Sequence, residues 1–180
     1  MLHLTLSGPF RSYVHAGSYP SDFKLRLYDC IAGMEHAVRN CWFQYITFDQ
    51  KFYDHHEWIE NGDFNWIIPG KMLAFGNPST NSKDYYGYFS HVPEDFVPIF
   101  KRWGITAVVR LNDVTYDAQR FVRNGIRHYD LYFPDGSCPS SEIIRRFLQI
   151  ANQENALAIH CTAGLGRTGT LIGIYAIEYH

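Results

Sequence analysis

Two segments in the first third of the chain carry apolar residues at the three- and four-residue steps of an amphipathic helix. The first runs from about residue 23 to residue 39, and its apolar residues are Leu27, Ile31, Met34 and Val38. The second begins at Asp49, a good N-cap, and ends at Asn61-Gly62, a good C-terminal stop. Residues 1–20 show little periodicity and are predicted to be a loop.

The middle of the chain changes from extended segments to a helix. Residues 64–69 and 71–75 read as extended segments around Pro69-Gly70, and we expect residues 61–76 to be a connector. Residues 77–86 are polar and rich in turn formers. Pro93 then stands at the favoured first position of a helix that Gly104 ends, with Pro98 as a site for a kink.

The remainder of the chain alternates between strand-like and helical patterns. Strands are predicted at 105–111, 126–133 and 156–160, and helices at 115–123, 140–153 and 171–179. Strands that alternate with helices indicate an α/β fold with a mostly parallel central sheet flanked by helices. Ligands of such sheets bind at the carboxyl ends of the strands.

Composition narrows the class of protein. The 180 residues are 46% apolar, which is ample for a core, and the net charge of −2 gives no general reason to expect nucleic acid or a membrane surface as partner. No apolar run approaches the roughly 20 residues of a membrane span. The four cysteines lack zinc spacing, and His55 and His56 are expected on the surface, so we predict neither a metal nor another cofactor.

The segment with the clearest chemistry is His160-Cys161 followed by five small or flexible residues and Arg167-Thr168. It lies between a strand-like and a helix-like run. Backbone N–H groups of a glycine-containing loop at a helix N-terminus converge on one centre, where they bind an anion and lower the pKa of a thiol. Cys161 is therefore predicted to be a thiolate nucleophile, and the alternative is a buried, inert cysteine beside a turn.

The other residues of this segment suit phosphoryl transfer. Arg167 is placed to grip two phosphate oxygens with its planar guanidinium, and Thr168 to hydrogen-bond the sulfur. His160 is expected to orient the loop through backbone groups and not to act as the base. A nucleotide P-loop is excluded because it needs Lys before its Ser or Thr, and Arg167 stands there. The predicted phosphate-binding residues are Thr162, Ala163, Gly164, Leu165, Gly166, Arg167 and Thr168.

Four stretches together resemble one family. They are ENGDFNWIIPGKMLAF (60–75), AVVRLN (107–112), HYDLYFPDGSCP (128–139) and HCTAGLGRTGTL (160–171). They are similar to the cell-division-cycle-fourteen, or mitotic-exit, dual-specificity protein phosphatases. The resemblance implies a cysteine-phosphatase fold, with residues 1–60 as the helical remnant of a preceding domain, 61–76 as a linker and 77–180 as the catalytic domain. It also implies further helices and a glutamine loop after residue 180, so we expect a fragment whose C-terminal part is missing.

A phosphatase of this type needs an acid that protonates the leaving oxygen. The candidate is Asp135, which is followed by Gly136 in a loop after a strand and matches the acid loop of the family. Asp130 is the rival, inside a predicted strand. Cys138, near the acid loop, is a candidate for a protective disulfide with Cys161.

The loop between Cys161 and Arg167 has no positive charge, which favours a protein phosphomonoester over an inositol lipid with additional phosphates. The resemblance implies phosphoserine followed by proline and a downstream basic residue, as in cyclin-dependent kinase substrates. Asp54 and Glu57 match positions in the family's acidic groove, and their alternative is a solvated helix face. Glu60 and Asp63 extend this acidic cluster. The resemblance further implies phosphorylated proteins as partners and a place in the nucleus and cytoplasm, including the spindle or centrosome.

One residue of the loop departs from the family pattern. Thr162 stands where the family usually has Lys, which removes a cation beside Cys161. Two alternatives to an active phosphatase follow from the expected truncation. One is a module that binds phosphoserine or accumulates phosphocysteine without turnover, and the other is an inactive product that does not fold stably.

Overall fold

The computed structural model describes residues 10–14, 23–83 and 85–179, so most of the loop predicted for residues 1–20 lies outside the described residues. The chain forms two compact units, Met1–Phe48 and Asp49–His180. In the first unit, the helix predicted for residues 23–39 is α1 (Leu27–Arg39), and none of its residues is buried. The second unit contains the sheet and the segment from His160 to Thr168.

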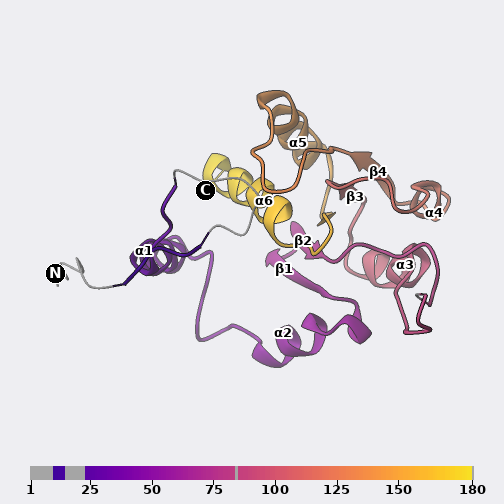
Figure 1. Ribbon diagram of the computed structural model, residues 1–180, viewed down its shortest axis with the longest axis horizontal. Helices are drawn as coiled ribbons and strands as arrows, with labels where there is room; N and C mark the ends of the chain where they lie inside the picture. Colours follow the sequence, from indigo (N-terminus) through magenta and orange to yellow (C-terminus); the bar gives the residue numbers. More distant parts are fainter. Residues whose placement is uncertain (1–9, 15–22, 84, 180) are drawn as a thin grey trace. The chain divides into compact units, whose positions relative to one another are not determined.

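A five-stranded sheet in the order β1-β2-β5-β3-β4 is the centre of the second unit (Figure 1). The strands are β1 (Phe64–Ile68), β2 (Met72–Phe75), β3 (Ala107–Arg110), β4 (Arg127–Asp130) and β5 (Leu157–His160). Strands β2, β5, β3 and β4 pair in parallel, and β1 pairs with β2 in the antiparallel direction. The predicted mostly parallel α/β sheet is thus confirmed.

The segment 61–76 differs from the connector that the sequence suggested. It forms the hairpin of β1 and β2, with Gly70 at a φ of +71° in the turn. The two short apolar runs around Pro69-Gly70 pair with each other, and β2 also pairs with the buried β5, which makes them part of the sheet.

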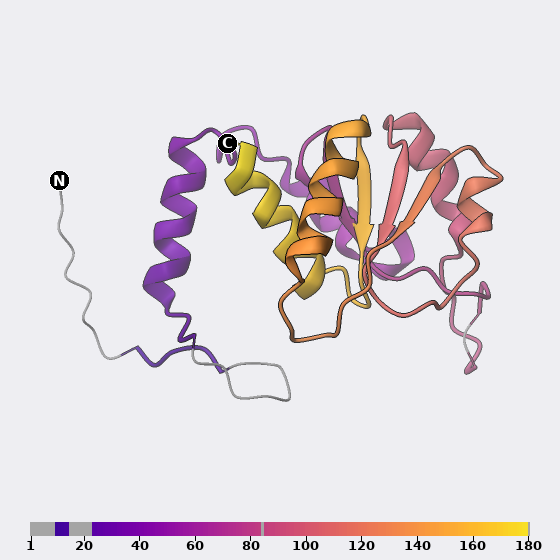
Figure 2. The ribbon, with the colours of Figure 1, turned by 90° about the horizontal axis from the view of Figure 1, so that it is seen from above.

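Helices cover both faces of the sheet (Figure 2). On one face lie α5 (Ser141–Gln153) and α6 (Gly166–Tyr179), whose core residues pack against Val109 and Ile159. On the other lie α3 (Pro93–Arg102) and the short α4 (Gln119–Val122), whose core residues pack against Val108 and Ala158. Alternate residues of β3 and β5 therefore face two separate cores. None of the helices in the described part of the chain is both long and apolar enough to cross a membrane.

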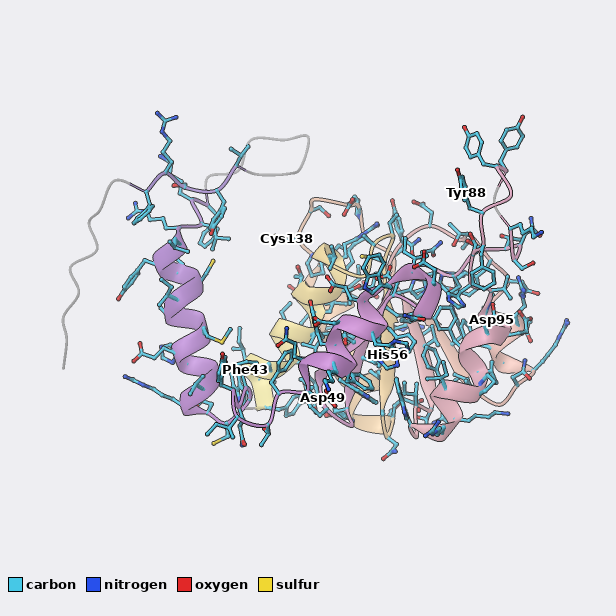
Figure 3. The ribbon with its side chains drawn as sticks, turned by 90° about the horizontal axis from the view of Figure 1, so that it is seen from below. Phe43, Asp49, His56, Tyr88, Asp95 and Cys138 are labelled. Carbon is cyan, nitrogen blue, oxygen red and sulfur yellow. The ribbon has the colours of Figure 1, made fainter. Side chains whose placement is uncertain are left out.

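The helix predicted to start at Asp49 is α2 (Gln50–Glu57), and the Asp49 carboxylate caps it by accepting a hydrogen bond from the N–H of Phe52 at 2.9 Å. His56, expected on the surface, is half-buried (Figure 3). Its ring lies 4.8 Å from the Phe64 ring and 5.9 Å from the Trp103 ring, centroid to centroid. These aromatic contacts pack α2 against the rest of its unit.

Candidate active site

The phosphate loop, which we define as residues 161–168, lies at the carboxyl end of the sheet. It follows β5, and the helix α6 begins within it at Gly166 (Figure 1). Because β5 lies between β2 and β3, the loop emerges between the segments that follow these two strands. This is the position where ligands bind in parallel sheets.

The sulfur of Cys161 is surrounded by hydrogen-bond donors of its own loop. Burial raises the pKa of the thiol, but hydrogen bonds from the Thr168 hydroxyl and from the N–H groups of Thr168, Leu165 and Gly164 outweigh it, so the pKa lies below its ordinary value. The Thr168 hydroxyl is buried and has no other hydrogen-bond partner, so it is available to the sulfur. The loop therefore favours negative charge at Cys161.

Gly164 holds the phosphate loop against the end of β2. Its φ is +68°, and a Cβ at this position would lie 2.3 Å from the carbonyl oxygen of Phe75. Any other residue would have to separate the loop from the strand and adopt a left-handed backbone conformation. The close approach of two backbones thus sets where the N–H groups of Gly164 and Leu165 point.

Arg167 is buried, with an exposed fraction of 5%, and its guanidinium joins three parts of the site. Nη2 donates to the Thr162 hydroxyl at 2.9 Å, Nη1 donates to the carbonyl oxygen of Phe133 at 3.2 Å, and Nε lies 3.4 Å from a carboxylate oxygen of Asp135. Nε makes no hydrogen bond. Thr162, which replaces the Lys of the family pattern, therefore acts here as an acceptor that orients the guanidinium, a role that Lys cannot take.

The two candidate acids have different surroundings. Asp135 lies beside Arg167 with an exposed side chain, in a loop with Gly136 at a φ of +68°. Asp130 is bound by Arg110, whose Nε and Nη2 donate to its two carboxylate oxygens at 2.6 and 3.1 Å. The structure thus brings Asp135, and not Asp130, to the phosphate loop.

Two asparagines support the phosphate loop from the neighbouring strands. The Asn77 N–H, just after β2, donates to the carbonyl oxygen of Thr162 at 3.1 Å. Asn112, just after β3, donates from Nδ2 to the Asn77 side-chain oxygen at 3.1 Å, and the Thr115 hydroxyl donates to the same oxygen at 2.9 Å. No role is predicted for these residues from the sequence, because their contacts arise only when β2, β5 and β3 lie side by side.

A buried polar layer lies beneath Cys161. His160 is fully buried, and its Nδ1 lies 3.0 Å from the Cys161 carbonyl oxygen, as expected for a residue that orients the loop. Its Nε2 lies 2.7 Å from the hydroxyl of Tyr116, which also lies 2.9 Å from Nε2 of His128. Burial lowers the pKa of His160 to about 3 and that of His128 to about 4, so both are neutral at pH 7. Sequence reasoning missed Tyr116 and His128.

The acidic residues occupy α2 and the segment after it. Asp54 and Glu57 are exposed, and no hydrogen bond joins either to the phosphate loop. Burial and the charge of Glu57 raise the pKa of Asp63, which lies further along the same segment. A Cβ on Gly76 would lie 2.3 Å from a carboxylate oxygen of Asp63, and Gly76 directly precedes the loop-supporting Asn77. Asp63, one member of the acidic cluster, therefore lies beside the chain that supports the phosphate loop.

The other predicted residues of the loop line its open side: Thr162, Ala163, Leu165 and Gly166 are exposed. Among the residues that the structure describes, no three His, Cys, Asp or Glu side chains are grouped so that they can hold a metal ion. Cys138 is exposed in the loop after Asp135 (Figure 3), and both it and Cys161 are free thiols.

Replacing Gly164 by Ala will remove the anion site. The added Cβ would meet the Phe75 carbonyl oxygen, and the φ of +68° would be strained, so the loop amides move away from their common centre. We expect the dissociation constant for tungstate, measured by calorimetry, to rise at least about tenfold. That is the effect of losing one charge-assisted hydrogen bond. Gly173→Ala, in α6 with open space around a Cβ, is the matched control and should bind tungstate normally. Equal binding by both variants would contradict this role of Gly164.

Stability will fall as the pH drops from 6.5 to 4.5, because His160 and His128 have lowered pKa values in the folded chain and take up protons on unfolding. Urea unfolding should show a loss of about 1.4 kcal/mol per pH unit for each histidine. Glu154, with its pKa lowered to about 2, adds a loss only below pH 4.5. His128→Gln should remove about half of the slope, and exposed His36→Gln should not change it. A flat profile down to pH 4.5 would contradict the neutral histidines.

The chain matches a known family and curated relatives. A family model described as "Polymorphic toxin system, DSP-PTPase phosphatase" matches residues 86–179, just over half of the chain. Dual specificity protein phosphatase CDC14A of Homo sapiens is 48% identical over 173 residues, which cover 96% of this chain and 29% of that protein. CDC14B of Mus musculus is 44% identical over 173 residues, which cover 96% of this chain and 35% of that protein.

A third relative is the tyrosine-protein phosphatase cdc-14 of Caenorhabditis elegans, which is 43% identical over 157 residues, covering 87% of this chain and 22% of that protein. The chain thus spans between about a fifth and about a third of the length of these three relatives. The resemblance predicted from the four sequence stretches is confirmed. The chain belongs to the DSP-PTPase phosphatase family, as a relative of the CDC14 phosphatases.

Proposed function

We propose that this chain is a dual-specificity protein phosphatase that hydrolyses phosphoserine, phosphothreonine and phosphotyrosine through a cysteinyl-phosphate intermediate. The observation that carries the proposal is the arrangement around Cys161. Its sulfur is held among loop N–H groups that lower its pKa, and the buried Arg167 pairs with Asp135 beside it. The phosphate loop thus supplies a nucleophile and an anion site, and the neighbouring loop with Asp135 supplies an acid.

In the first step the substrate phosphate enters the phosphate loop and displaces the Asp135 carboxylate from Arg167, whose Nε, which makes no hydrogen bond in this structure, then binds a phosphate oxygen. The Cys161 thiolate attacks phosphorus, the bond from phosphorus to the ester oxygen breaks, and the protonated Asp135 carboxyl donates its proton to that oxygen. The protein is left with a phosphorylated sulfur and a carboxylate at Asp135.

In the second step water attacks the phosphocysteine. The Asp135 carboxylate takes a proton from this water, the bond from sulfur to phosphorus breaks, and Cys161 is released as a thiolate together with inorganic phosphate. Both the acid and the base function fit an exposed carboxylate in a loop that Gly136 allows to move.

The substrate class follows from charge. The exposed residues of the phosphate loop, Thr162, Ala163, Leu165 and Gly166, are uncharged, so the loop has no cation for additional phosphates of an inositol lipid. The relationship to CDC14 phosphatases supports phosphoserine-proline sites with a downstream basic residue. The acidic groove of Asp54 and Glu57 is proposed to attract that residue, with Asp63 next to the loop.

The biological setting is proposed on the same relationship. The partners are phosphorylated proteins, with substrates of cyclin-dependent kinases among them. A cell-cycle role in the nucleus and cytoplasm, including the spindle or centrosome, fits this assignment.

Asp135→Asn will slow dephosphorylation in proportion to the basicity of the leaving oxygen. For a phosphoserine-proline-x-lysine peptide we expect kcat to fall about 10²- to 10⁴-fold, and for p-nitrophenyl phosphate, whose leaving group needs no proton, much less. Asp113→Asn, at an exposed aspartate, is the matched control and should keep normal rates on both substrates. Cys161→Ser should release no phosphate from either. Equal losses of Asp135→Asn on both substrates would exclude it as the acid, and turnover by Cys161→Ser would exclude the phosphocysteine route.

The acidic groove is tested by neutralising Asp54 and Glu57 together, as Asp54→Asn and Glu57→Gln. The ratio kcat/KM for a phosphoserine-proline peptide with a downstream lysine should fall about threefold to tenfold. A decrease of this size corresponds to the interaction energy of one or two exposed charge pairs. The same peptide with alanine in place of lysine should be cleaved at the unchanged rate. Glu142→Gln, an exposed carboxylate on α5, should not distinguish the peptides. Parallel losses on both peptides would contradict recognition of the basic residue.

A further inference from the structure

The segment between β2 and α3 folds back on itself as a short hairpin. We call it the aromatic hairpin and define it as residues 79–83 and 85–91. At its base the N–H of Ser79 donates to the carbonyl oxygen of His91 at 2.8 Å. Closer to its tip, Lys83 and Phe89 form an antiparallel bridge. These backbone contacts give the two arms of the hairpin a fixed register.

The base of the aromatic hairpin is anchored on both arms. The Thr80 hydroxyl donates to the carbonyl oxygen of Thr115 at 2.5 Å, and Arg120 Nη1 donates to the carbonyl oxygen of Thr80 at 2.8 Å. On the other arm, His91 Nε2 lies 3.2 Å from the carbonyl oxygen of Glu60. The segment after β3, the helix α4 and the segment after α2 thus hold the base together.

The aromatic hairpin is a neighbour of the phosphate loop. The N–H of Asn77, two residues before the hairpin, donates to the carbonyl oxygen of Thr162 at 3.1 Å. Figure 2 shows that the segment after β2 projects beyond the carboxyl ends of the strands, the edge at which the phosphate loop lies. Figure 3 places Tyr88 on the same side of the molecule as Cys138, which follows the acid Asp135. A polypeptide bound at the phosphate loop therefore passes close to the hairpin.

Beyond its anchored base, the hairpin presents aromatic side chains to solvent. The exposed fraction is 96% for Tyr85, 80% for Tyr86 and 72% for Tyr88, and none of the three belongs to either core of the sheet. Aromatic rings stabilise a fold when they are buried, so the fold gains little from rings in this position. Tyrosine is enriched in binding surfaces because its ring is rigid and amphipathic. An exposed tyrosine cluster on an anchored hairpin is typical of a recognition surface.

The charge and reach of the tip define what it can bind. Residues 85–89 carry no charge, unlike the acidic residues of α2, so the tip suits a large apolar or aromatic side chain. From Ser79 to Tyr85 the chain spans at most about 20 Å when fully extended. An extended substrate covers this distance in about six residues, because it also advances roughly 3.3 Å per residue.

We propose that the aromatic hairpin is a substrate-binding surface that takes a large apolar or aromatic side chain of a phosphorylated protein, within about six residues of the phosphoresidue. The partner, a phosphorylated protein, comes from the proposed function, on which this inference rests. The hairpin touches none of the reacting atoms, so it selects among phosphorylated sequences and leaves the chemical step unchanged. Its anchored base lowers the entropy lost on binding, because hydrogen bonds already hold the backbone.

The test measures binding, which does not depend on turnover. The Cys161→Ser chain is titrated by calorimetry with 15-residue phosphoserine-proline peptides that carry a downstream lysine, and phenylalanine is placed at one position at a time on either side of the phosphoserine. Phenylalanine between about three and about six residues away should lower the dissociation constant about fivefold to tenfold, as for an interface residue of moderate importance. Adding Tyr85→Ser and Tyr86→Ser should abolish this gain and leave binding of the peptide without phenylalanine unchanged.

Two further variants control for other effects. Tyr45→Ser removes a tyrosine that is 84% exposed in the other compact unit, and it should keep the gain from phenylalanine. Tyr85→Phe together with Tyr86→Phe retains both rings and should keep most of the gain.

Three results would overturn the proposal: no gain from phenylalanine at any position, a gain that survives the loss of both tyrosines, or a dimer in analytical ultracentrifugation that depends on Tyr85 and Tyr86. The wild-type chain separates this proposal from the proposed function. Tyrosine-dependent binding in a chain that releases no phosphate would leave the surface standing and contradict the phosphatase. Phosphate release at a rate that neither phenylalanine nor the two tyrosines affect would do the reverse.

Discussion

Convergence of backbone N–H groups on the Cys161 sulfur is the constraint on which the site depends. A buried thiol is normally protonated, because burial opposes its charge, and here the donors of residues 164–168 reverse that preference. Their direction is fixed by the close approach of Gly164 to the Phe75 carbonyl and by the start of α6 at Gly166. The nucleophile thus owes its charge to the Thr168 hydroxyl together with the backbone N–H groups that the path of the loop directs at the sulfur.

The sheet order explains why this path is held so firmly. With β5 between β2 and β3, the phosphate loop is flanked by Asn77 on one side and Asn112 on the other, and His160 beneath it meets Tyr116 and His128. These supports come from β5, from β4 and from the segments that follow β2 and β3. The mostly parallel sheet therefore acts as the frame that aligns the ends of several segments at one edge.

Sequence patterns were informative where a signal is local. The apolar runs on either side of the segment from Cys161 to Arg167 predicted the strand, loop and helix that the structure shows. Three further residues, Asp49, Pro93 and Ser140, mark helix starts close to their observed positions. The helix predicted for residues 115–123 is shorter in the structure, where α4 comprises Gln119–Val122. Tyr116, which was predicted to lie in this helix, instead belongs to the buried polar layer under Cys161.

Contacts between distant segments had no such signal. The two extended segments around Pro69-Gly70 are predicted as part of a connector, and only the pairing of β2 with β5 shows that they belong to the sheet. The bond from Arg167 to Thr162 and the pairing of Asp130 with Arg110 likewise depend on the folded arrangement. The second of these distinguishes the rival Asp130 from Asp135, the acid that the sequence predicts.

The central claim is that Cys161 accepts the phosphoryl group. The most direct measurement is a rapid acid quench of the chain during reaction with a phosphorylated peptide, followed by mass spectrometry of the fragment that contains Cys161. The account predicts a fraction of that fragment heavier by one phosphoryl group, with the modification on the cysteine sulfur. Phosphate release with an unmodified Cys161, or with the phosphoryl group on another residue, would contradict it.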